Sequence, residues 1–168
     1  IAAQALRDAG HEHVAVVDVD AHHGNGTQAL FYDRADVHYA SLHVDPGAGW
    51  FPHYAGFADE TGRGLGAGAN LNVPLAPGSG DEVWLEALDR LVESVAAHGS
   101  TALVVSLGVD AAAADPESPL HVSHAAYEEG GARLAELGLP TVAVQEGGYH
   151  LDTIGDLVAV TLRGLARR

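Results

Sequence analysis

Short apolar runs alternate with amphipathic segments along the chain. The apolar runs have the length and β-branched composition of buried strands, and they cover residues 13–20, 37–44, 69–75, 102–110 and 140–149. The other segments space their apolar residues as helices do, and they cover residues 1–9, 26–34, 81–99, 125–137 and 151–165. Apolar strands that alternate with helices predict an α/β fold, a parallel sheet with helices on both faces.

One long segment departs from this pattern. Residues 45–68 are rich in glycine and proline and indicate a loop. Loops of this length are usually functional or flexible. We find no repeat and no domain linker, and 168 residues are about the length of one domain. The sequence therefore predicts one domain over residues 1–168.

Composition excludes several classes of function. The chain has no cysteine, so disulfides and thiolate metal sites are excluded. It has no lysine, which excludes a P-loop and a Schiff-base mechanism. With 8 basic and 23 acidic residues the net charge is −15, which argues against nucleic acid as a partner. No apolar run approaches the ~18 residues of a membrane span. We expect a cytoplasmic protein whose acidic surface gives solubility or attracts cationic substrates.

Titratable side chains stand where the predicted strands end. Asp20 ends the first predicted strand and His22 comes two residues later, so on an extended segment their side chains point the same way. Asp110 ends another strand. Ligands bind outside the carboxyl ends of parallel strands, and two carboxylates with one imidazole leave a zinc ion one open position, as in catalytic sites. Asp20 and His22 alone would favour a helix cap or a polar loop, but together with Asp110 and the stretch EGGY they favour a metal centre.

The stretch EGGY, residues 146–149, ends the last predicted strand. Its two glycines let the backbone pass close to a ligand. The phenol of Tyr149 could then donate a hydrogen bond to a developing oxyanion. The alternative is a turn with a packed tyrosine.

Three stretches together carry a family resemblance. DVDAHHGNGTQ, SLGVDAAAADP and EGGYHL, in this order and spacing, resemble the zinc-dependent histone deacetylase superfamily. SLHVDP and FADETGRGLGAGANLNVPL most resemble its bacterial acetylpolyamine-amidohydrolase and class-II-like branch. The resemblance runs from Ile1 to about Leu165. It implies an arginase/deacetylase-like fold and an enzyme that hydrolyses the acetamide of acetyl-lysine or of an acetylpolyamine with metal-activated water.

The resemblance also implies roles for single residues. Asp20, His22 and Asp110 would bind Zn²⁺, with Fe²⁺ as the alternative metal, and Tyr149 would hydrogen-bond the amide carbonyl. Asp18 would orient a catalytic histidine, and Asn25 stands where some members have an aspartate behind the second histidine. Asp18 would also form a structural K⁺ site with Ser41 and the carbonyl of Leu42. The substrate tunnel would be lined by Phe51, Gly147 and Gly148. Glu117 would lie at the tunnel mouth and favour a cationic substrate, although an exposed loop glutamate is the simpler interpretation.

The family places a His-His pair, its general base and acid, upstream of the zinc strand. This chain opens on Ile1 and contains no methionine. We therefore expect a C-terminal fragment that lacks the pair and the N-terminal strands, so that a sheet edge is exposed. Because general acid–base catalysis contributes ~10²–10⁴-fold, we expect the fragment to be weakly active or inactive.

Two other functions remain as alternatives. A dimanganese ureohydrolase needs an aspartate two residues after the metal-binding histidine, where this sequence has Gly24. A non-catalytic module that binds acyl-amines is the second alternative, against which Tyr149 argues mildly. The sequence leaves open the substrate, the metal in vivo and the oligomeric state, with a homodimer as one alternative.

Overall fold

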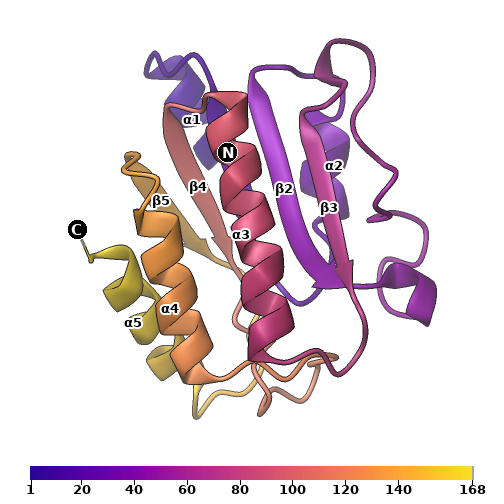
Figure 1. Ribbon diagram of the computed structural model, residues 1–168, viewed down its shortest axis with the longest axis vertical. Coiled ribbons are helices and arrows are strands. Elements are labelled where there is room, and N and C mark those ends of the chain that lie inside the picture. The colour runs from indigo at the N-terminus through magenta and orange to yellow at the C-terminus, as the bar shows by residue number, and fades with distance from the viewer. Residues whose placement is uncertain (168) are drawn as a thin grey trace.

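A five-stranded parallel sheet organises the chain, in the order β3-β2-β1-β4-β5 (Figure 1). The structure is a computed structural model and describes residues 1–167. The strands are β1 (Val14–Asp18), β2 (Val37–Val44), β3 (Asn70–Leu75), β4 (Ala102–Leu107) and β5 (Thr141–Gln145). The helices are α1 (Ala2–Asp8), α2 (Asn25–Phe31), α3 (Asp81–His98), α4 (His124–Ala135) and α5 (Ile154–Leu165).

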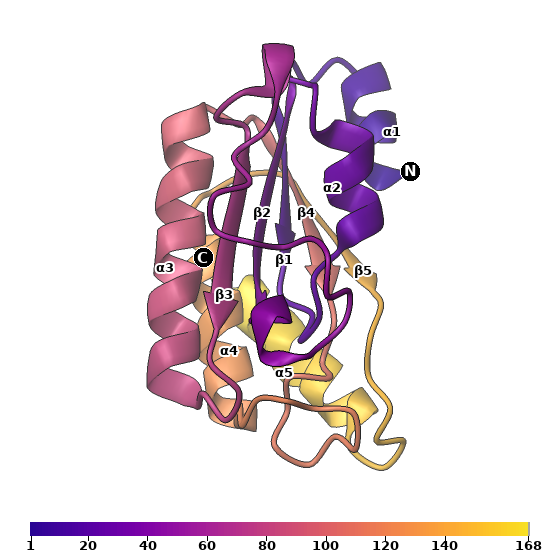
Figure 2. The ribbon, with the colours of Figure 1, turned by 90° about the vertical axis from the view of Figure 1, so that its right-hand side faces the viewer.

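Helices cover both faces of the sheet, which confirms the predicted α/β fold. Figure 2 shows α1 and α2 on one side of the strands and α3 on the other. Each face has its own buried apolar cluster. The larger lies under α3, α4 and α5 and the smaller under α1 and α2. Every residue of β1 and β2 is buried, as expected for central strands with helices on both faces. The buried residues include the polar side chains of Asp18, His38, Ser41 and His43.

Helices α4 and α5 approach closely because both carry glycine at their contact. A Cβ on Gly131 would lie 2.3 Å from the carbonyl oxygen of Thr161, and a Cβ on Gly164 would lie 2.1 Å from that of Glu128. Gly130 faces the other way, with the Trp84 ring of α3 in the space of a side chain. The glycines inside the predicted helix 125–137 therefore do not interrupt it, since they make its packing possible.

The strands end earlier than the sequence predicts. β1 stops at Asp18 and β4 at Leu107, whereas the predicted strands run to residues 20 and 110. After β1 the carboxylate of Asp18 accepts the backbone N–H of Asp20 (3.2 Å), and the carboxylate of Asp20 accepts that of His22 (2.9 Å). Such local bonds replace the bonds of a sheet ladder, so the candidate metal ligands stand on loops beyond the sheet.

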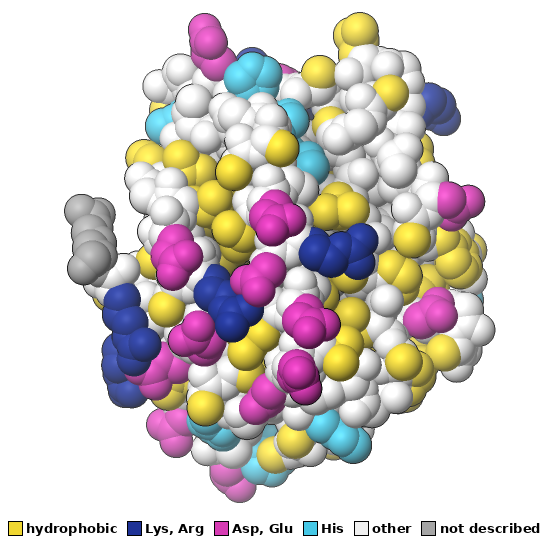
Figure 3. Space-filling view, in the orientation of Figure 1, with side chains coloured by type: hydrophobic (Ala, Val, Ile, Leu, Met, Phe, Trp, Pro, Cys, Tyr) yellow, Lys and Arg dark blue, Asp and Glu magenta, His cyan; other side chains and the backbone are white. Residues whose placement is uncertain are grey.

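Strand β5 forms one edge of the sheet and is more exposed than its apolar sequence predicts. Val142 keeps 40% of its surface exposed. The segment 45–68 contains two short 3₁₀ turns, η1 (Pro46–Ala48) and η2 (Gly64–Gly66), and no strand. Acidic side chains spread over the face formed by α3 and α4, with arginines among them (Figure 3). Among residues 1–167, no helix has the length and apolar character needed to cross a membrane.

Candidate metal centre and substrate cleft

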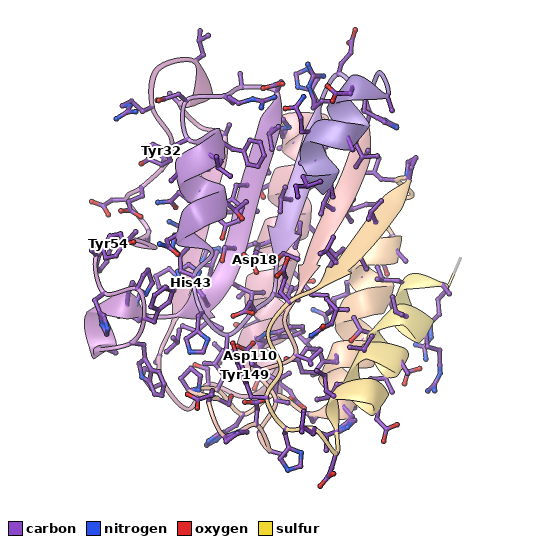
Figure 4. The ribbon with its side chains drawn as sticks, turned by 180° about the vertical axis from the view of Figure 1, so that it is seen from behind. Asp18, Tyr32, His43, Tyr54, Asp110 and Tyr149 are labelled. Atoms are coloured by element: carbon purple, nitrogen blue, oxygen red, sulfur yellow. The ribbon has the colours of Figure 1, made fainter. Side chains whose placement is uncertain are left out.

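Asp20, His22 and Asp110 converge at the carboxyl ends of β1 and β4. One ligand atom from each lies within 4.8 Å of the other two. The His22 Nδ1 lies 3.0 Å from Asp110 Oδ2 and 3.5 Å from Asp20 Oδ1. Figure 4 shows Asp110 and Tyr149 together at this end of the sheet. The structure thus brings together the three residues that the sequence predicts as a metal group.

Backbone N–H groups from separate loops hold the two carboxylates. Asp110 Oδ1 accepts the N–H of Ala21 at 2.8 Å, which links the loop after β4 to the loop after β1. Asp20 Oδ2 accepts the N–H of Gly147 at 3.1 Å, which adds the loop after β5. Each aspartate is therefore fixed by a segment that is distant in sequence, and the site forms only when the three strands are in register.

Two glycines leave room for these carboxylates. A Cβ on Gly147 would lie 2.3 Å from Asp20 Oδ2 and 2.7 Å from Asp110 Oδ2. A Cβ on Gly108 would also lie 2.3 Å from Asp20 Oδ2. A side chain at either position would occupy the space of an aspartate oxygen, so glycine is required there on steric grounds.

The electrostatics of the group favour a bound cation. Burial raises the pKa of the Asp110 carboxyl above its usual range. Burial opposes ionisation of Asp20 as well, but hydrogen bonds with His22 outweigh it and lower the pKa of Asp20. Hydrogen bonds to Asp110 and Asp20 raise the pKa of His22 to about 9. Asp20 and Asp110 both hydrogen-bond to the imidazole of His22. Two carboxylate oxygens and one imidazole nitrogen are also suitable ligands for a divalent metal, which could bind where the shared proton now lies.

An open cleft of 560 Å³ lies above this group. Phe51 and Tyr149 line it as aromatic walls, each with about half its surface exposed, and Glu117 adds a carboxylate. Partial burial and the charges of Asp110 and Asp20 raise the pKa of Tyr149. Tyr149 therefore stays a neutral phenol near pH 7, which can donate a hydrogen bond to a group in the cleft.

The predicted K⁺ position lies where β1 and β2 run side by side. Asp18 and Ser41 are register partners, and Leu42 is the next residue of β2. Asp18 Oδ2 accepts a hydrogen bond from the Tyr39 hydroxyl at 2.9 Å. Burial, followed by the charge of Asp20, raises the pKa of Asp18 to about 8. The Ser41 hydroxyl pairs with His43 Nδ1 at 2.8 Å.

The family described as "Histone deacetylase domain" matches residues 1–165. The chain belongs to the histone deacetylase family. An acetylpolyamine amidohydrolase of Mycoplana ramosa is 48% identical over 166 residues, which are 99% of this chain and 48% of that protein. Acetylpolyamine amidohydrolase 1 of Pseudomonas aeruginosa is 48% identical over 164 residues. The chain spans about half the length of these curated relatives.

Solved structures of the histone deacetylase family share this arrangement. A crystal structure of acetylpolyamine aminohydrolase from Burkholderia pseudomallei superposes with a TM-score of 0.93 at 43% identity, over 97% of this chain and 47% of that one. A histone deacetylase homologue from Aquifex aeolicus gives 0.88 at 34% identity, over 96% and 44%. These likenesses confirm the predicted deacetylase-like fold.

The structure shows which groups surround Asn25 and the two glycines of the predicted tunnel. Asn25 Nδ2 donates to the Tyr54 hydroxyl at 2.6 Å, and Gln28, not Asn25, contacts His23 (3.0 Å). The reason is that α2 begins at Asn25, which turns this side chain outward and Gln28 inward. Gly147 packs against the carboxylates of Asp20 and Asp110, and Gly148 faces Val109 and Ile154.

A buried polar network behind the site escaped the sequence analysis. Glu60 Oε2 accepts the N–H groups of Gly56 (2.7 Å) and Phe57 (3.1 Å) and the side-chain amide of Gln28 (3.0 Å). His43 Nε2 pairs with the carbonyl of Gly56 at 2.8 Å, and burial, followed by His23, lowers the pKa of His43 to about 3. No short motif marks this network, because its members come from separate elements.

Proposed function

We propose that the full-length protein is a zinc-dependent amidohydrolase that removes acetyl groups from acetylpolyamines or from acetyl-lysine. One observation carries the proposal: Asp20, His22 and Asp110 converge beneath a cleft whose wall holds a neutral tyrosine. The relatives from Mycoplana ramosa and Pseudomonas aeruginosa are named as acetylpolyamine amidohydrolases. Since the chain spans half their length, the activity belongs to the full-length protein.

Asp20, His22 and Asp110 would hold the metal, with Zn²⁺ as the preferred ion and Fe²⁺ as the alternative. The metal would supply Lewis acidity toward the acetamide carbonyl and toward water. Asp18, Ser41 and the Leu42 carbonyl would bind K⁺ between β1 and β2, beside this group. Support for the K⁺ site comes from the register of these residues and from the buried carboxylate of Asp18.

The residues of the cleft would bind the substrate and stabilise its charge. The Tyr149 hydroxyl would donate a hydrogen bond to the acetamide oxygen as negative charge develops there. Phe51 would pack against the aliphatic chain of the substrate. Glu117, exposed beside the cleft, would accept the ammonium group of a polyamine. We assign the general base and acid to no residue of this chain, in keeping with the expected upstream His-His pair.

The structure gives a physical argument against the ureohydrolase alternative. Gly24 stands where such an enzyme needs an aspartate for a second metal. A Cβ at this position would lie 2.4 Å from Asp18 Oδ2 and 2.6 Å from the Tyr39 hydroxyl. Within residues 1–167, the group of Asp20, His22 and Asp110 is the one set of side chains placed to bind a metal. We therefore propose a single catalytic metal.

Zinc binding tests the proposal directly. In the full-length protein we expect one tightly bound Zn²⁺, measured by calorimetry and elemental analysis. The variant Asp110→Asn should lose this ion, because an amide is a poor ligand. At a hundredfold excess over Kd, zinc should raise the free energy of unfolding of the parent by about 2.7 kcal/mol and leave that of the variant unchanged.

A surface aspartate provides the matched control. Asp89 pairs with Arg133 on the outside of α3, so Asp89→Asn should keep full zinc binding. Asp110→Asn should itself fold, since it keeps an oxygen for the N–H of Ala21 and removes a buried charge. A folded parent without zinc, or an Asp110→Asn protein that binds zinc as the parent does, would contradict the ligand assignment.

A further inference from the structure

One buried carboxylate joins the two loops that carry Glu117 and Tyr149. Asp115 Oδ1 accepts the N–H of Glu117 at 2.9 Å. Asp115 Oδ2 accepts the N–H groups of Tyr149 at 2.7 Å and of His150 at 3.1 Å. Asp115 itself is 8% exposed and does not line the cleft. Its contacts therefore reach the cleft only through the backbone of other residues.

The hydrogen bonds of Asp115 hold these two loops firmly together. An ionised carboxylate is an acceptor only, and bonds from N–H groups to it are stronger than those to a neutral oxygen. Asp115 is fixed in turn by its own backbone, whose N–H donates to the carbonyl of Ala112 at 2.9 Å and whose carbonyl accepts the N–H of Ser118 at 3.1 Å. The Asp115 side chain thus ties the loop after β4 to the Tyr149–His150 part of the loop after β5. A backbone bond from the N–H of Val109 to the carbonyl of Gly147 (2.8 Å) joins the same loops nearer the sheet.

We propose that Asp115 is a positioning residue that holds Tyr149 and Glu117 at a fixed separation. This inference rests on the proposed function, in which Tyr149 meets the acetamide oxygen and Glu117 meets the ammonium group. If the distance between the Tyr149 hydroxyl and the Glu117 carboxylate is fixed, the site selects substrates by the distance between their acetamide and ammonium groups. Asp115 then affects two properties of the enzyme. It positions the Tyr149 hydroxyl for turnover, and it fixes the separation from Glu117 that selects among acetylated diamines.

Amide hydrogen exchange tests the contact without reference to activity. In the full-length protein, Asp115→Ala should raise the exchange rates of the Tyr149 and His150 amides about tenfold or more, because both lose their acceptor. Asp115→Asn keeps one oxygen, so either this pair or the Glu117 amide should exchange faster. Unchanged exchange at all three amides in both variants would overturn the proposal.

Asp45 offers a matched control for the turn. It also precedes a proline, and its Oδ1 accepts the N–H of Gly47 at 2.7 Å, as Asp115 Oδ1 accepts that of Glu117. Within residues 1–167 its carboxylate accepts no N–H from a second loop. Asp45→Ala should therefore leave exchange at Tyr149 and His150 unchanged. If the amides of Tyr149 and His150 also exchanged faster in the Asp45 variant, the faster exchange would reflect a general loss of stability. That result would overturn the specific role of Asp115.

Kinetics then separates positioning from a merely structural role. With acetylated diamines of increasing chain length, Asp115→Ala should lower kcat about tenfold and flatten the preference for one length, while the zinc content stays that of the parent. A parent without hydrolysis would contradict the proposed function, and the exchange result would still decide whether Asp115 joins the loops. An active parent with unchanged kcat and length preference in the variant would overturn the positioning role.

Discussion

Gly147 shows how one missing side chain sets the geometry of the candidate site. Because a Cβ there would lie 2.3 Å from Asp20 Oδ2, Gly147→Ala should displace a ligand and abolish zinc binding. It should also lower the free energy of unfolding by about 1–3 kcal/mol through overpacking. Gly155, in α5, has no atom within 4 Å of an added Cβ. Gly155→Ala should bind zinc normally, and equal zinc affinities for both variants by calorimetry would contradict this account.

A second prediction at the scale of the residue concerns the proposed role of Glu117 in substrate selection. If its carboxylate meets the ammonium group of a polyamine, Glu117→Leu should lower kcat/KM for an acetylpolyamine about tenfold and leave an uncharged acetyl-lysine peptide unaffected. The difference should shrink as salt is added, since the carboxylate is exposed. Glu82→Leu, on the outer face of α3, is the control. Equal losses with both substrates would show that Glu117 has no part in selection.

At the scale of elements, the sequence predicts the order of strands and helices well because each has its own hydrophobic period. It overestimates the strand ends, since apolar residues such as Val19 and Val109 continue the pattern while the chain leaves the sheet. The ligand group is predictable because parallel strands bring their carboxyl ends to one edge. Contacts between loops, such as those of Asp115, leave no periodic signal and become visible only in three dimensions.

The side chain of Glu60 holds part of the loop 45–68 in place. Glu60 Oε2 accepts hydrogen bonds from two backbone N–H groups and from Gln28. Glu60→Ala should leave these donors without an acceptor and lower the free energy of unfolding by about 1–3 kcal/mol. Limited proteolysis should then cleave within 45–68 faster. The exposed neighbour Asp59 provides the control, Asp59→Ala. The same cleavage rate in both variants would contradict the role of Glu60 in holding this loop.

At the scale of the whole molecule, stability should depend on the charge of His38, a buried histidine far from the cleft. His38, on β2, is buried between the sheet and α3, where its Nε2 pairs with Ser94 Oγ at 2.9 Å. The ring of His98 stacks on it at 5.0 Å between centroids, and His13 lies edge-on to His98 at 5.2 Å. Burial and the neighbouring His98 lower the pKa of His38 to about 4. A charged His38 is therefore costly in the fold.

The sign of the pH dependence follows from this shift. The pKa of His38 is lower in the folded than in the unfolded chain, where it is about 6.5. The contribution of neutral His38 to the free energy of unfolding is therefore fully present above pH 6.5 and is lost as pH falls toward 4. The loss amounts to about 3 kcal/mol. Asp18 and His22 shift in the opposite sense, because the fold raises both pKa values and favours their protonated forms. Only a difference between variants isolates the share of His38.

Urea unfolding of the metal-free full-length protein at pH 7.5 and pH 5 provides this difference. His38→Gln keeps a group that can bond Ser94 but cannot become charged, so it should lose less stability between the two pH values than the parent does. The exposed His124, at the start of α4, gives the control variant His124→Gln, which should follow the parent. If His38→Gln and the parent lose the same amount, acid sensitivity arises elsewhere, and the paired charges of the metal group become the next place to measure it.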